Sequence, residues 1–171
     1  MAKIQYEGGS YRTYGELPSV GSRAPDFSLV NMDLKDVTLA NWMGMRKIFN
    51  IFPSIDTPVC AASVIAFDKY SKDYDDVAEL MISYDLPFAH RRFCEKHSLK
   101  RVVGLSAIRH MGFGENYGVQ IVEGPLAGMF SRAVVVLDEN NTVVHQEQIE
   151  DLAKEPDYRS AYQALGIQIE D

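Results

Sequence analysis

Two cysteines, Cys60 and Cys94, are the side chains of this 171-residue chain best suited to covalent or redox chemistry. Cys60 follows a Thr-Pro pair, Thr57 and Pro58, just beyond the apolar run 47–52. Threonine is a favoured N-cap residue and proline suits the first helical position, so this order makes Cys60 the third residue of a helix. Its sulfur would then lie beside free backbone N–H groups at the positive end of the helix dipole. That environment favours the thiolate over the thiol.

The residues alone leave several interpretations of these thiols open. Two cysteines are too few for the disulfide framework of a small secreted domain, and Ser63 stands where a Cys-x-x-Cys motif would place its second cysteine. Cys60 could be an inert buried thiol, a catalytic nucleophile or half of a redox pair. A metal site is a further alternative, because His90, Cys94 and His97 would share one face of a continuous helix.

The bulk composition narrows the function classes. The chain is 46% hydrophobic and 24% charged, with a formal net charge of −7. This negative charge opposes phosphate binding, and the small basic cluster within residues 90–101 carries no nucleic-acid motif. The glycines of residues 112–118 have the wrong spacing for a phosphate loop. No segment reads as a secretory signal or membrane span, so we expect one cytoplasmic domain over residues 1–171, without nucleic-acid or membrane partners.

Strand-like and helix-like patterns alternate along the chain. A β-hairpin is expected around Gly8-Gly9, and short strands are expected at residues 24–31, 36–42, 47–53, 77–85 and 101–107, with a second hairpin over 131–149. Helices are expected at residues 59–74, 85–94 and 155–165, with a short frayed helix within 109–118. This order predicts an α/β fold whose mixed sheet is flanked by helices.

Arg132 is an unusual residue for its position. It begins the run Arg132–Leu137, which is otherwise suited to complete burial. A buried guanidinium needs an anionic partner, and a thiolate at Cys60 would provide one.

Several stretches together resemble a known enzyme family. Pro53, Thr57 and Cys60 match the Pro-x-x-x-Thr-x-x-Cys signature of peroxiredoxins. The stretches NIFPSIDT, DLPFA, NYGV, GPLAG and RAVVVLDEN resemble the bacterial thiol peroxidases, which are atypical two-cysteine peroxiredoxins. The similarity covers nearly the whole chain. It implies a thioredoxin-like fold with an N-terminal β-hairpin, and reduction of hydrogen peroxide and alkyl hydroperoxides in antioxidant defence.

The resemblance also implies a role for each matching residue. Cys60 would be the peroxidatic cysteine, which becomes a sulfenic acid, and Cys94 the resolving cysteine, which forms an intrachain disulfide with it. Thr57 would supply a hydrogen-bonding hydroxyl, Pro53 would shield the thiolate from water, and Arg132 would donate to the thiolate and to the peroxide. Thioredoxin would recycle the disulfide, the chain would form a homodimer, and no metal, haem or flavin cofactor would be needed.

Three positions qualify this interpretation. Arg109 is a second arginine that could act electrostatically or at a dimer contact. Pro58 stands where relatives often have glycine, and Glu95–Ser98 replaces the small residues and glycine that often follow the resolving cysteine. Both departures bear on how readily the two cysteine-bearing helices unwind. A thioredoxin-fold binding or chaperone protein without turnover is the remaining alternative function.

Overall fold

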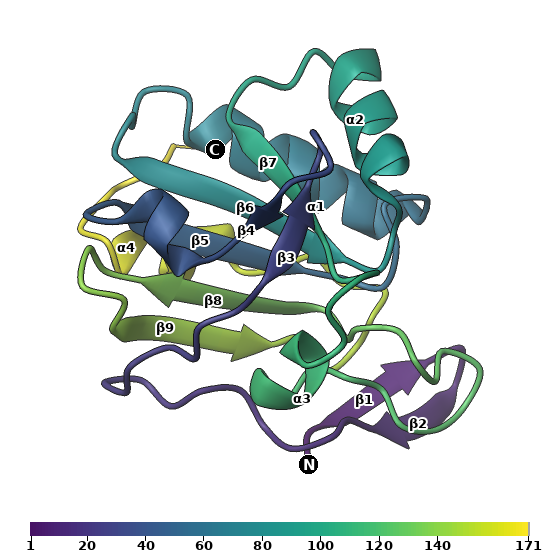
Figure 1. Cartoon of the computed structure of the whole chain (residues 1–171). Helices are drawn as coiled ribbons and strands as arrows, with labels where there is room; N and C mark the ends of the chain where they lie inside the picture. The colour runs from purple at the N-terminus through teal and green to yellow at the C-terminus, as the bar shows by residue number, and fades with distance from the viewer. Residues whose placement is uncertain (171) are drawn as a thin grey trace.

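A seven-stranded mixed sheet forms the centre of the computed structural model, which describes residues 1–170 (Figure 1). Its strands, in chain order, are β3 (Leu29–Asn31), β4 (Asp36–Val37), β5 (Arg46–Ile51), β6 (Val77–Ser83), β7 (Val102–Ser106), β8 (Ala133–Leu137) and β9 (Val143–Gln148). They are arranged in the order β4-β3-β7-β6-β5-β8-β9. Strand β6 pairs in parallel with β5 and β7, while the other pairs are antiparallel. The predicted mixed sheet is confirmed.

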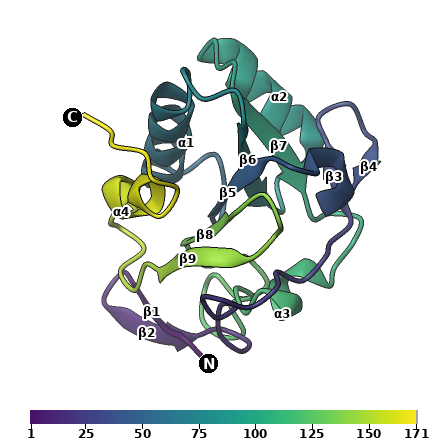
Figure 2. The same cartoon turned by 90° about the vertical axis from the view of Figure 1, so that its left-hand side faces the viewer.

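The helices cover both faces of this sheet. They are α1 (Pro58–Tyr70), α2 (Pro87–Lys96), α3 (Phe113–Asn116) and α4 (Tyr158–Gln163), with a 3-10 turn at Leu39–Trp42. Figure 2 shows α1 and α4 together on one side of the sheet and α3 on the other. Phe67 of α1 and Tyr162 of α4 pack on Ile48 of β5, whereas Phe113 of α3 packs with Phe49 on the opposite face. Among the helices of residues 1–170, none is long and apolar enough to span a bilayer.

The predicted elements exist, but several of their boundaries were wrong. The strand expected at 24–31 begins only at Leu29, and the helix expected at 155–165 covers only Tyr158–Gln163. The N-terminal hairpin pairs β1 (Lys3–Tyr6) with β2 (Gly9–Arg12), and its turn is Glu7-Gly8 instead of Gly8-Gly9. Both turn residues have positive φ, which matches the twist of a two-residue hairpin. Helix α1 ends at Tyr70, four residues early, and only the first part of the strand expected at 36–42 forms.

The N-terminal hairpin packs beside the segment that follows β9. The Gln5 N–H donates to the Glu150 carbonyl at 2.7 Å, and the Leu152 N–H donates to the Gln5 carbonyl at 3.1 Å. Ile4, Ile121 and Leu152 form a small buried cluster at this contact. The hairpin therefore reaches the part of the molecule where α1 begins, and it takes part in the site described below.

A buried acid lies between the sheet and the helices α1 and α4. Glu79 of β6 accepts hydrogen bonds from the hydroxyls of Ser71 and Tyr162, and its Oε2 has no partner within the described residues. Burial raises the pKa of Glu79 to about 8, although those two hydrogen bonds oppose the shift. Burial also lowers the pKa of His90 to about 4.

Glu79 should make the protein less stable as the pH rises. The folded state holds the Glu79 proton up to a pKa of about 8, whereas the unfolded chain releases it near 4.5, so the free energy of unfolding falls through this window. His90 acts in the opposite sense only below its ordinary pKa of 6.5. We therefore expect Glu79→Gln to remove a loss of about 1 kcal/mol or more between pH 6.5 and pH 8.

Urea unfolding at the two pH values measures this difference. Glu16→Gln is the matched control, because it is the same substitution at a side chain that is 79% exposed. An equal pH dependence in Glu79→Gln and in the unaltered protein would contradict the assignment.

Candidate active site

The first turn of α1 presents Cys60 as the sequence predicts. Thr57 is the N-cap in an extended conformation, its Oγ1 accepts the Cys60 N–H at 3.3 Å, and Pro58 occupies the first helical position. Residues 52–57 connect this turn to β5, whose buried residues fix where the connecting loop begins. Local capping chemistry therefore brings the sulfur to the N-terminal end of α1, facing backbone groups that carry partial positive charge.

Arg132 is the cationic partner of this thiol. Its Nη1 donates to Cys60 Sγ at 3.3 Å, while Nε and Nη2 donate to the Leu152 carbonyl at 3.3 and 2.8 Å. The side chain is only 2% exposed, so the guanidinium meets the sulfur away from bulk water. A fixed, desolvated cation favours the thiolate and can also stabilise negative charge that develops during a reaction. The predicted pairing of Arg132 with Cys60 is present.

A cavity of about 660 Å³ opens beside this pair. Pro53, Thr57 and Arg132 all line it. Most of the remaining lining surface is apolar and comes from the first turn of α1, the N-terminal hairpin, the 123–130 loop and the segment after β9: Tyr6, Val59, Leu126, Met129 and Leu152. The acids Glu7, Asp56 and Asp151 also line the cavity. Cys60 itself is completely buried, so a reactant must approach it from the cavity past Pro53, Thr57 and Arg132.

Cys94 lies in the last turns of α2. Both cysteines are free thiols, and they belong to one apolar cluster that also contains Phe52, Ile55 and Met81. Burial raises the pKa of Cys94 to about 11, with a smaller contribution from the negative charges of nearby acids. Cys94 is therefore a thiol while it remains enclosed.

The metal-site alternative finds no support in the geometry. Within residues 1–170, no group of three or more His, Cys, Asp and Glu side chains is placed to hold a metal ion. His90 is buried and contacts Ser83 at 2.8 Å, whereas the His97 ring packs on Phe93 with ring centroids 4.4 Å apart. The histidines of α2 thus have separate structural contacts.

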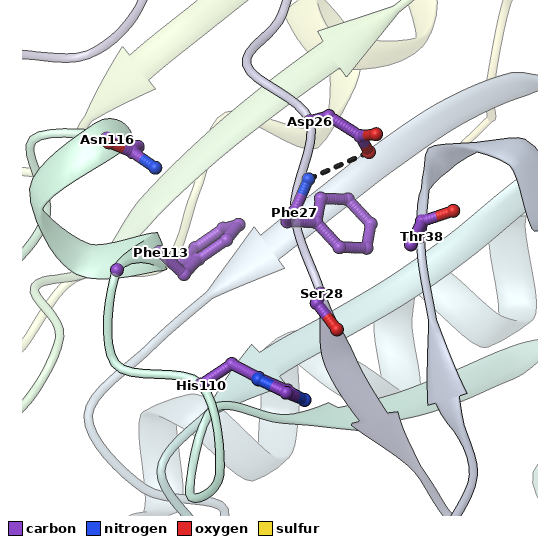
Figure 3. Close-up of a pocket in the computed structure, with 8 residues that line it drawn as sticks. Asp26, Phe27, Ser28, Thr38, His110, Phe113 and Asn116 are labelled. Atoms are coloured by element: carbon purple, nitrogen blue, oxygen red, sulfur yellow. Dashed lines mark hydrogen bonds between the residues drawn. The ribbon is translucent and has the colours of Figure 1, made fainter.

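Arg109 forms an ion pair away from Cys60. Its guanidinium pairs with Asp36 at 3.0 Å, beside His110, which contacts the same carboxylate at 2.8 Å. His110 also lines a second, open pocket of about 420 Å³, shown in Figure 3. The Asp26 carboxylate in that pocket accepts hydrogen bonds from the backbone N–H groups of Phe27 and Leu39, so it stabilises the local backbone. None of the five predicted site residues lines this pocket.

The sequence did not predict two kinds of site group: a backbone carbonyl, and side chains that distant segments bring to the cavity. The Leu152 carbonyl, which fixes Arg132, carries no side-chain signal, and Tyr6, Leu126 and Met129 become cavity walls only when distant segments meet. Asp85 was expected to help begin α2, but the N-cap is Leu86, which makes no side-chain capping bond. The carboxylate of Asp85 has different partners, considered further below.

Comparison with known proteins agrees with this fold and geometry. Residues 19–165 match the Redoxin family. The chain is 44% identical over 166 residues to the thiol peroxidase of Mycobacterium bovis, covering 97% of this chain and 99% of that protein. The crystal structure of a peroxiredoxin-like protein from Aquifex aeolicus superposes with a TM-score of 0.89 at 30% identity, covering 96% of both chains. A thiol peroxidase structure from Chromobacterium violaceum also has a TM-score of 0.89, at 24% identity and with 96% and 95% of the two chains covered.

These findings define an enzyme of the peroxiredoxin class, with a thioredoxin-like fold. The chain belongs to the Redoxin family, and its resemblance to bacterial thiol peroxidases is confirmed.

Replacing Arg132 with methionine should slow the reaction of Cys60 with peroxide by roughly 10²-fold or more, the scale seen when preorganised charge stabilisation is lost. Methionine keeps much of the apolar stem but removes every donor to Cys60 and to the Leu152 carbonyl. Stopped-flow oxidation measures this rate.

Arg109→Met is the matched control, because Arg109 pairs with Asp36 and makes no contact with Cys60. It should leave the oxidation rate unchanged. An unchanged rate in Arg132→Met would place Arg132 outside the reaction.

Proposed function

We propose that this peroxiredoxin reduces hydroperoxides through Cys60, with Arg132, Thr57 and Pro53 completing the site. The Cys60 thiolate attacks one oxygen of the peroxide, the O–O bond breaks, and the second oxygen leaves as an alcohol or water after taking a proton. Cys60 is oxidised to a sulfenic acid and the peroxide is reduced. The observation that carries this proposal is the direct contact between the buried Arg132 guanidinium and Cys60 Sγ in the first turn of α1.

The positions of Thr57 and Pro53 suit the roles proposed for them, which are hydrogen bonding and shielding of the thiolate. The Thr57 Oγ1 accepts from the Cys60 N–H, so its own hydroxyl hydrogen is free to donate to a thiolate or a peroxide oxygen. Pro53 is buried, lines the cavity and has no N–H, which limits the water that can solvate the sulfur. A less hydrated thiolate is a stronger nucleophile toward the bound peroxide.

The cavity supports organic hydroperoxides as substrates in addition to hydrogen peroxide. Its volume of about 660 Å³ far exceeds the space of two oxygen atoms. The apolar side chains of Val59, Leu126, Met129 and Leu152 would contact an alkyl group, while the peroxide end lies toward Arg132 and Thr57.

Cys94 is the proposed resolving cysteine. Its sulfur attacks the sulfenic acid sulfur, an S–S bond forms within the chain, and the oxygen leaves as water. Both thiols occupy one cluster but begin in separate helices, so local unwinding must precede the bond. Unwinding would also expose Cys94, reverse the burial that raises its pKa to about 11, and so favour the reactive thiolate.

The C-terminal end of α2 is suited to local unwinding around Cys94. The Leu99 N–H donates to the Cys94 carbonyl and the Ser98 N–H to the Glu95 carbonyl, which together close the helix in a Schellman motif. Ser98 holds the left-handed position of that motif with φ 54°, where glycine would be unstrained. A serine in this left-handed position therefore weakens the turn that carries Cys94, whereas Pro58 stiffens the turn that carries Cys60.

Thioredoxin is the proposed reductant, and a homodimer the proposed assembly. Thioredoxin would reduce the Cys60–Cys94 disulfide by thiol–disulfide exchange and become oxidised in turn. A groove of about 390 Å³ between the first turn of α1 and α2, lined by Thr57, Ala61 and Phe93, separates the two cysteine-bearing elements. Opening this groove would bring the disulfide toward an incoming dithiol.

A coupled assay tests the proposal: hydroperoxide consumption is followed with thioredoxin, thioredoxin reductase and NADPH. We expect turnover with hydrogen peroxide and with cumene hydroperoxide, and a lower KM for the bulky substrate. Consumption with dithiothreitol but not with thioredoxin would overturn the choice of reductant. Failure to consume either peroxide with any thiol would instead favour a binding protein without turnover.

A further inference from the structure

The loop between β5 and α1 is held by a carboxylate from outside the recognised site. This loop carries Pro53 and Thr57, and the two residues just after Pro53 both bond to Asp85. The Ser54 hydroxyl donates to Asp85 Oδ1 at 2.9 Å, and the Ile55 N–H donates to Oδ2 at 2.8 Å. One side chain thus fixes a hydroxyl and a backbone amide of the loop at the same time.

The same carboxylate ties the loop to the element that leads into α2. The Ser83 hydroxyl, at the end of β6, donates to Asp85 Oδ2 at 2.6 Å. Since that hydroxyl has one hydrogen, Ser83 Oγ must accept from His90 Nε2, which lies 2.8 Å away. His90 is fully buried and packs against β7 at Gly104, where a Cβ would come within 2.6 Å of the ring-bearing carbon.

Asp85 therefore links the peroxide-binding loop to the first turn of the helix that carries Cys94. Its side chain is only 11% exposed, and its oxygens face hydrogen-bond donors from Ser54, Ile55 and Ser83. A carboxylate accepts from all three donors, whereas an amide of the same shape would keep the two Oδ2 contacts only by turning its NH₂ group toward Ser54, whose hydroxyl would then have to accept. These contacts therefore suit a carboxylate better than an amide.

We propose that Asp85 is a positioning residue for the peroxidase reaction: it holds the Pro53–Thr57 loop in the conformation that reacts with peroxide, and it ties that loop to α2 until Cys60 has been oxidised. This inference rests on the proposed function of Cys60 and Cys94. Small displacements of the loop would misplace the Thr57 hydroxyl and the shielding Pro53 relative to Cys60, and such errors strongly reduce rates. Release of the same tie would help the two cysteine-bearing segments to move toward each other.

Asp85→Asn tests the inference because it keeps the side-chain shape. We expect the oxidation of Cys60 by one equivalent of cumene hydroperoxide to slow by about 10-fold or more. We expect disulfide formation from the sulfenic acid to be at least as fast as in the unaltered protein, because that step needs the hydrogen bonds that tie the loop to α2 to be released. Rapid-quench alkylation followed by mass spectrometry measures both steps in one experiment.

Asp33→Asn is the matched control. Asp33 also contacts α2, through Arg91 at 2.9 Å, but its side chain is 74% exposed and has no contact with the loop. It should leave both steps within twofold of the unaltered protein. Labelling of buried Cys94 in each variant reports whether the fold is intact.

The outcomes separate the inference from the function on which it rests. Oxidation of Asp85→Asn within twofold of the unaltered rate overturns the positioning role, as does an equal slowing of both steps. If Asp85→Asn does not fold, Ser54→Ala decides. It removes the bond to Asp85 Oδ1 and the contact that Ser54 Oγ accepts from the Asp56 N–H, while the Ile55 bond to Asp85 remains. It should slow oxidation by about threefold, and an unchanged rate overturns the proposal. A lack of peroxide-dependent oxidation of Cys60 in the unaltered protein would instead refute the proposed function.

Discussion

Cys60→Ser is expected to abolish peroxide reduction. A serine hydroxyl at the same place stays protonated at neutral pH and is a far weaker nucleophile than a thiolate. Arg132 and the N-terminal end of α1 would still be present, so the loss would measure what the sulfur contributes. The coupled peroxidase assay should return the rate seen without enzyme for both peroxides.

The substitution is nearly isosteric, so folding should survive. Cys60 is completely buried with its N–H bonded to Thr57, and serine can keep that capping contact. Circular dichroism and urea unfolding check this. Cys94 should not replace the missing nucleophile, because burial raises the pKa of Cys94 to about 11 and keeps it protonated in the closed structure. Retention of most of the parent activity in folded Cys60→Ser would refute the catalytic assignment.

The parts of the site that were predictable depend on local chemistry. Thr57, Pro58 and Cys60 are consecutive parts of one helix start, and cap preferences act within a single turn. Arg132 was conspicuous because it directly precedes β8, whose residues are all buried. A buried guanidinium demands an acceptor, and the structure supplies Cys60 and the Leu152 carbonyl.

The parts that were not predictable depend on contacts between distant segments. Asp85 was interpreted from its neighbours as a helix start, but its acceptors are used by Ser54 and Ile55, about 30 residues earlier in the chain. The cavity wall joins the N-terminal hairpin to the loop that contains Leu126, and the patterns of hydrophobicity in these segments do not specify that meeting. Helix α1 ends at Tyr70, and the hydroxyl of its C-cap residue Ser71 contacts Glu79 and Tyr162, which come from distant parts of the chain.

Cys94→Ser should separate the two chemical steps. The first step should proceed at nearly the unaltered rate, because Cys60 keeps Arg132, Thr57 and the cavity. The intrachain disulfide cannot form, so the protein should stop at the Cys60 sulfenic acid or become oxidised further. Turnover supported by thioredoxin should fall sharply, since thioredoxin would have no disulfide to reduce.

Mass spectrometry after one equivalent of peroxide distinguishes the products. The unaltered protein should show an intrachain Cys60–Cys94 disulfide, and Cys94→Ser should show added oxygen on Cys60. A small thiol such as dithiothreitol should partly restore turnover in the variant, because it can attack the sulfenic acid directly and then complete the reduction. A disulfide between two chains in the unaltered protein, through Cys60 of both or Cys60 of one and Cys94 of the other, would contradict the intrachain mechanism. Full thioredoxin-dependent turnover in Cys94→Ser would remove Cys94 from the mechanism and leave Cys60 as the sole redox group that the reaction requires.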